Sequence, residues 1–108
     1  MKLLNAFSLN MLDSSTPAHP HTVQVAVVSL TEARLLAAKG LDSCVGHADT
    51  AAVFAAVLGT KVPMTRVTVT LSYKERCLVG QYTGPRLPEG ATALPQGAEI
   101  KWLLVTVV

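Results

Sequence analysis

The stretch Val23–Gly40 reads VQVAVVSLTEARLLAAKG, and it decides the fold class. Its first part, Val23–Val28, is rich in β-branched valine and predicts a strand. Ser29 and Glu32 then have the spacing of a capping box, in which side chains bond the free N–H groups at a helix start. Gly40 predicts the end of that helix. Its apolar residues fall on one face, and they are Ala33, Leu36 and Ala37.

Further elements are predicted on both sides of this stretch. Upstream, Lys2–Phe7 predicts a short strand. Asp13–Thr22 contains proline and serine, which interrupt regular structure, and it predicts a loop. Downstream, the apolar spacing in His47–Leu58 predicts a second helix that ends at Gly59.

The C-terminal half predicts three more strands. Arg66–Tyr73 alternates polar and apolar residues with a period of two, which is typical of a half-buried strand. A turn at Lys74–Arg76 leads into Cys77–Tyr82, so we expect an antiparallel hairpin. The proline-bearing Gly84–Gly97 predicts a loop, and Ile100–Val108 predicts an apolar final strand. The element order predicts an α+β domain with two helices packed on a mixed sheet of about five strands.

Its length places the whole chain, residues 1–108, in one domain. Half of the residues are apolar and 15% are charged. This composition excludes a disordered chain.

The longest apolar run is Ala51–Leu58. A membrane-spanning helix needs roughly 20 apolar residues, so this run is far too short. Polar residues interrupt the apolar start of the chain and no cleavage site for a signal peptide follows. We therefore expect a cytoplasmic protein without membrane contact.

Several polar residues in the N-terminal half are candidates for a binding site. Asn5, Ser8 and Asn10 interrupt or follow an apolar strand, where they either line a site or bond the local backbone. His47 follows Gly46 at a predicted helix start. Free N–H groups at such a start attract anions such as phosphate, and a histidine there can donate a proton. The alternative for His47 is a helix cap.

Two arginines in the second half are candidates for phosphate contacts, because a guanidinium group binds phosphate in a bidentate manner. Arg66 begins the polar face of the predicted strand. Arg86 and Glu89 lie in the segment Gly84–Gly90, where prolines fix the backbone. The alternative is that both arginines are solvated surface residues.

No metal or cofactor is predicted. His19 and His21 have a chelating spacing, but no third ligand is near in the sequence, so we expect surface histidines. The sequence contains no phosphate-binding glycine loop and no Cys-x-x-Cys pair. Its few carboxylates argue against a two-metal nuclease. Cys44 and Cys77 neither require nor exclude a disulfide, and the expected cytosolic location favours free thiols.

Four motifs, in order along the chain, resemble the small ring nucleases of type III CRISPR systems, a family with a viral anti-CRISPR form and a related host form. They are Leu4–Leu12 (LNAFSLNML), Gly46–Thr50 (GHADT), Val62–Val67 (VPMTRV) and Arg86–Gly90 (RLPEG). The resemblance implies a phosphodiesterase of cyclic tetra-adenylate, the messenger that activates CRISPR-linked nucleases. It also implies a two-fold homodimer that encloses the ring and needs no metal. The 2′-hydroxyl of the ligand would attack the neighbouring phosphorus, which leaves linear di-adenylate with 2′,3′-cyclic phosphate ends.

Matching positions assign roles under this resemblance. His47 would protonate the departing 5′ oxygen, Arg86 would stabilise charge on the phosphate, and Glu89 would orient neighbouring groups. Gly84–Pro85 lengthens the segment before Arg86 by one residue relative to the family. The ligand-binding residues that the resemblance implies are Asn5, Ser8, Asn10, Arg66 and Gln81.

Two other function classes stay open at this point. A binding protein would sequester a cyclic oligonucleotide or another RNA without cleaving it, with His47 as a helix cap. A small viral interaction protein would use the polar motif residues only to shape its fold. The formal net charge of +2 argues against DNA or long RNA as a partner. A two-fold dimer, in contrast, suits a symmetric ring. The apolar Ile100–Val108 is a candidate for the dimer interface.

Overall fold

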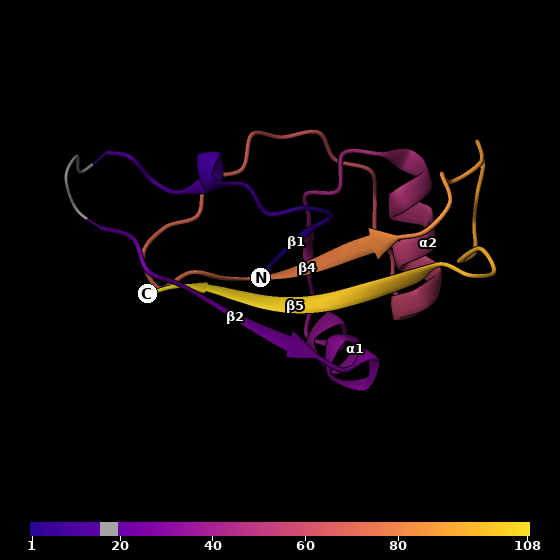
Figure 1. Ribbon diagram of the computed structural model, residues 1–108, viewed down its shortest axis with the longest axis horizontal. Coiled ribbons are helices and arrows are strands. Elements are labelled where there is room, and N and C mark those ends of the chain that lie inside the picture. Colours follow the sequence, from indigo (N-terminus) through magenta and orange to yellow (C-terminus); the bar gives the residue numbers. More distant parts are fainter. Residues whose placement is uncertain (16–19) are drawn as a thin grey trace.

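A computed structural model describes residues 1–15 and 20–108. Their five strands form one sheet in the order β2-β5-β4-β1-β3 (Figure 1). Strand β5 is antiparallel to β2 and β4, whereas β1 is parallel to β4 and β3, so the sheet is mixed and the predicted α+β class is confirmed. In chain order the elements are β1 (Lys2–Leu4), the 3-10 turn η1 (Leu9–Met11), β2 (Val23–Val28), α1 (Leu30–Ala38), β3 (Asp42–Ser43), α2 (Ala48–Leu58), β4 (Arg76–Thr83) and β5 (Glu99–Val107).

The stretch that decides the fold class forms as predicted. Strand β2 has the predicted bounds, and α1 begins directly after Ser29. Ser29 Oγ accepts a hydrogen bond from the Glu32 amide at 3.1 Å. This bond satisfies one of the free N–H groups at the helix start. Helix α2 begins after His47 and ends at Gly59, also as predicted.

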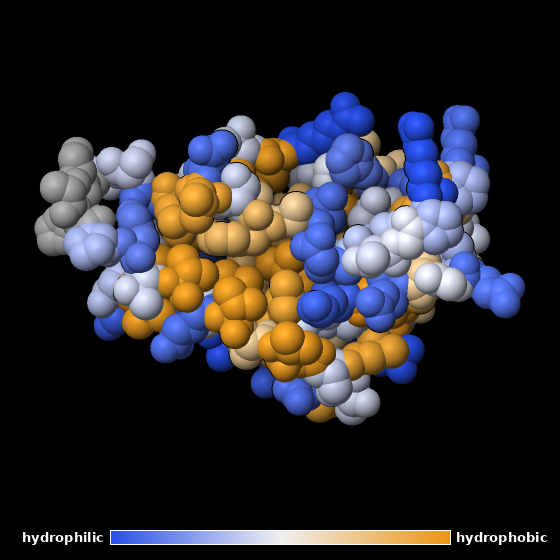
Figure 2. Space-filling view, in the orientation of Figure 1, coloured by the Kyte–Doolittle hydropathy of each residue, from blue (hydrophilic) through white to orange (hydrophobic). Residues whose placement is uncertain are grey.

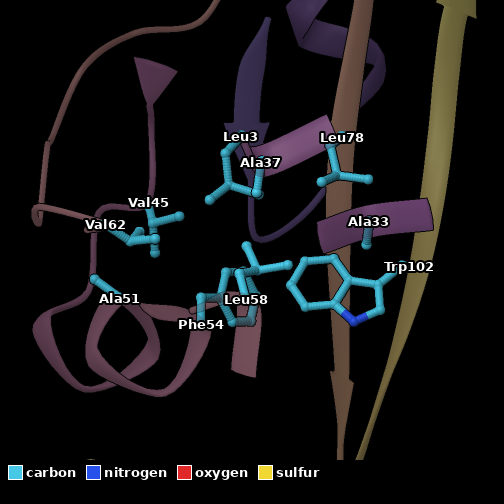
Figure 3. Close-up of a cluster of buried hydrophobic side chains, with 10 residues drawn as sticks. All are labelled: Leu3, Ala33, Ala37, Val45, Ala51, Phe54, Leu58, Val62, Leu78 and Trp102. Carbon is cyan, nitrogen blue, oxygen red and sulfur yellow. The ribbon is translucent and has the colours of Figure 1, made fainter. Parts of the chain in front are cut away.

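Both helices pack against one face of the sheet, where they enclose the main core (Figures 1 and 3). The rings of Phe54 from α2 and Trp102 from β5 lie 5.1 Å apart between centroids, in a tilted arrangement. Gly80 of β4 makes room for them, because a Cβ there would lie 2.5 Å from Phe54 Cζ and 2.7 Å from Trp102 Cζ3. The buried residues of this cluster are Leu3, Ala33, Ala37, Val45, Ala51, Phe54, Leu58, Val62, Leu78 and Trp102.

The other face of the sheet is partly covered, by irregular chain and the short η1 rather than by α-helices. The segments 7–12 and 69–71 pack over it, and the Leu71 amide donates to the Met11 carbonyl oxygen at 2.6 Å. They close a second apolar cluster, whose buried residues are Leu4, Leu71, Cys77, Val79, Val105 and Val107.

The predicted strand Arg66–Tyr73 and its hairpin with Cys77–Tyr82 are wrong. Strand β4 pairs with β5 on one side and with β1 on the other, so neither edge of β4 is free for a hairpin partner. Residues 66–70 have no regular secondary structure, Leu71 forms an isolated bridge with Leu12, and Tyr73 begins a turn. The alternation of apolar residues reflects burial, but Val69 and Leu71 pack onto the face of the sheet and do not belong to one of its strands.

Three smaller differences concern strand bounds and neighbours. Strand β1 ends at Leu4 instead of continuing to Phe7, which turns onto the second cluster. Strand β3 has only two residues, too few to give a periodic signal in the sequence. The predicted final strand forms as β5, but it lies between β2 and β4, so Trp102, Val105 and Val107 are buried within the chain. A subunit interface on this segment stays a prediction.

Cys44 and Cys77 are free thiols. Burial raises the pKa of the Cys77 thiol to about 11 and also raises the pKa of Cys44. Both side chains therefore stay protonated near neutral pH and act as small apolar residues. Among the described residues, no helix has the length and apolar character needed to cross a membrane.

An ion pair between Lys2 and Glu75 ties β1 to the turn before β4, and it makes stability depend on pH. Partial burial acts to raise the pKa of Glu75. Hydrogen bonds from Lys2 Nζ and the Ser72 amide outweigh that effect, so the pKa lies below its ordinary value. A lowered carboxyl pKa stabilises the fold at pH values above the ordinary value of about 4.3, and this contribution disappears as pH falls further.

We expect wild type to lose about 1 kcal/mol of stability between about pH 5 and pH 3 as Glu75 becomes protonated. Glu75→Gln lacks the carboxylate at every pH and should not show this loss. Urea unfolding at a series of pH values measures this, with the exposed Glu99→Gln as the matched control. An unchanged pH dependence in Glu75→Gln would contradict the assignment.

Candidate functional site

His47 occupies the position just before the first turn of α2, with φ −126° and ψ 126°. Its imidazole makes no capping hydrogen bond to this described helix, and the residue is exposed. The side chain is thus not used as a helix cap, which was the alternative from the sequence. Its ring is free to contact a group bound at the helix start, where the amides and the helix dipole favour an anion.

A cleft of about 950 Å³ opens beside this helix start. It brings together His47, Arg86 and Glu89, the three residues that the resemblance assigns to catalysis. His47 comes from the start of α2, whereas Arg86 and Glu89 come from the loop between β4 and β5. The full lining is His47, Asp49, Thr50, Tyr82, Gly84, Arg86, Leu87, Pro88 and Glu89.

The loop that carries Arg86 and Glu89 is held by contacts at both ends. At its start, the Tyr82 hydroxyl donates a hydrogen bond to the Pro85 carbonyl oxygen. At its end, the Gly90 amide donates to Asp49 Oδ1 at 3.0 Å. The loop therefore rests on β4 on one side and on the first turn of α2 on the other.

A second cavity of about 370 Å³ shares His47 with the first. Its polar lining includes Asn5 and Arg66, and its apolar lining includes Leu4 and Val69. Arg66 Nε donates to the Gly46 carbonyl oxygen at 3.1 Å, so this arginine contacts the residue that precedes His47. Two of the five predicted ligand-binding residues thus lie next to the predicted proton donor.

The other three predicted ligand-binding residues line neither of these cavities. The Ser8 hydroxyl accepts a hydrogen bond from the Asn10 amide at 3.3 Å, which is the backbone-capping alternative from the sequence. Gln81 pairs with Lys101 across β4 and β5. Because side chains alternate along a strand, Gln81 points to the opposite face of the sheet from Tyr82, which lines the cleft.

The described residues contain no group of three or more His, Cys, Asp or Glu side chains that could hold a metal ion. His21 is exposed, and His19 lies outside the described residues. Of the predicted His-x-His pair, only His21 therefore lies among the described residues.

Sequence reasoning missed several residues that shape the cleft. Asp49 and Thr50 stand inside the quoted Gly46–Thr50 motif, so their place next to His47 was the available signal. Tyr82 had a weaker signal, as an aromatic residue at the end of a predicted strand. Leu87 stands inside the quoted Arg86–Gly90 motif, but its partial burial is seen only in the folded loop.

Comparison with known proteins agrees with the fold and covers almost the entire chain. A family model described as STIV B116-like matches residues 1–102. Among solved structures, B116 of Sulfolobus turreted icosahedral virus is similar, with a TM-score of 0.74, 26% sequence identity and coverage of 96% of both chains. A search of curated proteins finds no match.

Proposed function

This chain belongs to the STIV B116-like family, and on that premise we propose that it is a metal-independent ring nuclease. It would cleave cyclic tetra-adenylate to linear di-adenylate with 2′,3′-cyclic phosphate ends, and so switch off or counter type III CRISPR immunity. The observation that carries the proposal is the cleft in which His47, Arg86 and Glu89 lie together at the start of α2.

The start of α2 and Arg86 form an anion site. The first amides of an α-helix carry partial positive charge and bind phosphate oxygens. A guanidinium group on the same cleft adds a full charge with bidentate geometry. A scissile phosphate placed there would meet both groups, and they would stabilise the negative charge that develops in the transition state.

The remaining chemistry needs one proton donor, because the nucleophile belongs to the ligand. The 2′-hydroxyl loses its proton to solvent water as the new bond from O2′ to phosphorus forms. His47 supplies a proton to the 5′ oxygen as the bond from phosphorus to that oxygen breaks. A positioned donor of this kind contributes about 10²–10⁴-fold to a rate. Glu89, on the same loop as Arg86, would orient the groups around the phosphate.

The second cavity would hold a neighbouring part of the ring. Asn5 offers an amide that can bond the edge of an adenine base, and Arg66 offers a further cation. Because His47 borders both cavities, a ligand that occupies both would pass its backbone across the imidazole. Ligand contacts of Ser8, Asn10 and Gln81 stay predictions.

We propose a two-fold homodimer as the active form. Figure 2 shows apolar side chains gathered over β2 and β5 on the face in view. Val25 and Val27 of the edge strand β2 are 57% and 71% exposed. Such exposure of neighbouring apolar residues is typical of an interaction surface rather than of a monomer surface. Two chains related by a two-fold axis would present two equivalent clefts to a ring with the same symmetry. A binding stoichiometry of one ring for two chains tests this part.

The experiment that tests the activity separates cleavage from simple binding. Cyclic tetra-adenylate is incubated with a stoichiometric excess of the protein, and the nucleotides are then separated by chromatography. We expect conversion to linear di-adenylate, with loss of that conversion in Arg86→Ala. The matched control is Arg76→Ala, which removes an exposed arginine of β4 that lines neither described cavity.

Two results would overturn the proposal. An intact ring that remains bound to the protein would indicate a sequestering protein. Neither binding nor cleavage would indicate that the motif residues serve the fold or another partner.

A further inference from the structure

We propose that Asp49 and Tyr82 are positioning residues that hold the segment 84–90, here called the cleft loop, so that Arg86 and Glu89 face His47. The catalytic consequence rests on the proposed function, whereas the structural part of the inference does not. Neither Asp49 nor Tyr82 has a role in the proposed chemistry, yet both line the cleft.

The first contact joins the cleft loop to the helix that carries the proton donor. Asp49 Oδ1 accepts a hydrogen bond from the Gly90 amide at 3.0 Å. Asp49 lies in the first turn of α2, two residues after His47, which directly precedes the helix. The hydrogen bond therefore fixes the end of the cleft loop relative to the imidazole.

The second contact joins the start of the cleft loop to the sheet. The Tyr82 hydroxyl donates to the Pro85 carbonyl oxygen. Gly84 lets the chain turn there, with φ +149°, and a Cβ at this position would lie 2.7 Å from the Ala98 Cβ. Arg86 lies directly after the Pro85 contact, and Glu89 lies directly before the contact at Gly90.

These contacts matter because the functional side chains have little other support. Arg86 and Glu89 are both exposed, so burial does not fix their positions. Rate depends steeply on placement, and a shift of about 1 Å in a catalytic group can cost about 10²-fold. A loop tethered at both ends restricts that shift without placing Arg86 or Glu89 in the core.

The charge of Asp49 is unfavourable in a cleft for a polyanion, because it repels phosphate. Its presence there is explained by the acceptor that it offers to Gly90. Asp49→Asn keeps an oxygen acceptor and removes the repulsion, whereas Asp49→Ala removes both. An acidic residue in the first turn also stabilises the helix dipole. Both variants lose that stabilisation equally, so it cannot produce a difference between them.

The test compares kcat and KM for cyclic tetra-adenylate among matched variants. For Asp49→Ala we expect kcat to fall by about 10-fold or more, following the dependence of rate on placement. For Asp49→Asn we expect kcat within about two-fold of wild type and a lower KM, because a like charge is removed. For Tyr82→Phe we expect a several-fold fall in kcat. Asp42→Ala and Tyr73→Phe are the controls, since these exposed residues line neither described cavity.

A second measurement tests the hydrogen bond from the Gly90 amide directly and does not depend on catalysis. Hydrogen exchange of the Gly90 amide, followed by NMR, should be faster in Asp49→Ala by about 10-fold, the factor that corresponds to losing a hydrogen bond of about 1.4 kcal/mol. It should stay close to wild type in Asp49→Asn. A wild-type protein that does not cleave the ring would contradict the proposed function alone. Unchanged Gly90 exchange in Asp49→Ala, or an equal loss of kcat in both Asp49 variants, would overturn the inference.

Discussion

Replacing His47 by alanine is expected to lower the rate of cyclic tetra-adenylate cleavage by about 10²–10⁴-fold, the usual contribution of a positioned proton donor. Binding should persist, because the helix-start amides, Arg86 and the second cavity are unchanged. The fold should persist too. His47 is exposed and its imidazole makes no capping bond to α2, so its removal leaves no buried group without a partner.

Single-turnover kinetics measures the rate, and calorimetric titration of His47→Ala with the intact ring measures the binding. We expect a stoichiometry of one ring for two chains. The matched control is His21→Ala, which removes an exposed histidine that lines neither described cavity. Unchanged cleavage by His47→Ala would remove this residue from the mechanism.

Phe54→Ala is expected to lower the free energy of unfolding by about 3–5 kcal/mol. Phe54 is fully buried and its ring packs against Trp102 over Gly80 (Figure 3). Gly80 has no side chain that could move into the space left by the ring. The other side chains around the ring relax only partly after such a truncation, so a cavity remains and its surface adds to the cost of the lost apolar burial.

Urea unfolding followed by the fluorescence of Trp102, the single tryptophan, measures this loss. Leu35→Ala is the control, because Leu35 is 62% exposed on α1. Removal of such a surface side chain should change stability by less than about 0.5 kcal/mol. A loss below about 1 kcal/mol for Phe54→Ala would contradict the packing around Gly80.

Local signals in the sequence predicted those parts of the fold that local interactions determine. Ser29 and Glu32 placed the start of α1, and Gly59 placed the end of α2. The pairing of strands depends on distant segments, and here the prediction failed. Arg66–Tyr73 has the alternation of a strand, but the parallel neighbour β1 occupies the edge of β4 that the expected hairpin required. A period of two reports where side chains point, and it does not report which strand lies alongside.

The candidate site was predictable as a set of residues but not as a geometry. Motifs named His47, Arg86 and Glu89, and the fold brings these three to one cleft. The contact that ties the cleft to α2 had no signal in the sequence, since Asp49 and Gly90 are 41 positions apart. Tyr82 reaches the cleft because strand alternation turns it to the helix side, and the same alternation turns the neighbouring residue away.

The central claim is that this chain cleaves cyclic tetra-adenylate through its own side chains and the 2′-hydroxyl of the ligand. The most direct measurement is incubation of the ring with the protein in excess chelator, followed by mass spectrometry of the product ends. We expect complete conversion to linear di-adenylate that carries 2′,3′-cyclic phosphate. An intact ring after prolonged incubation, or conversion that requires an added divalent metal ion, would contradict the claim.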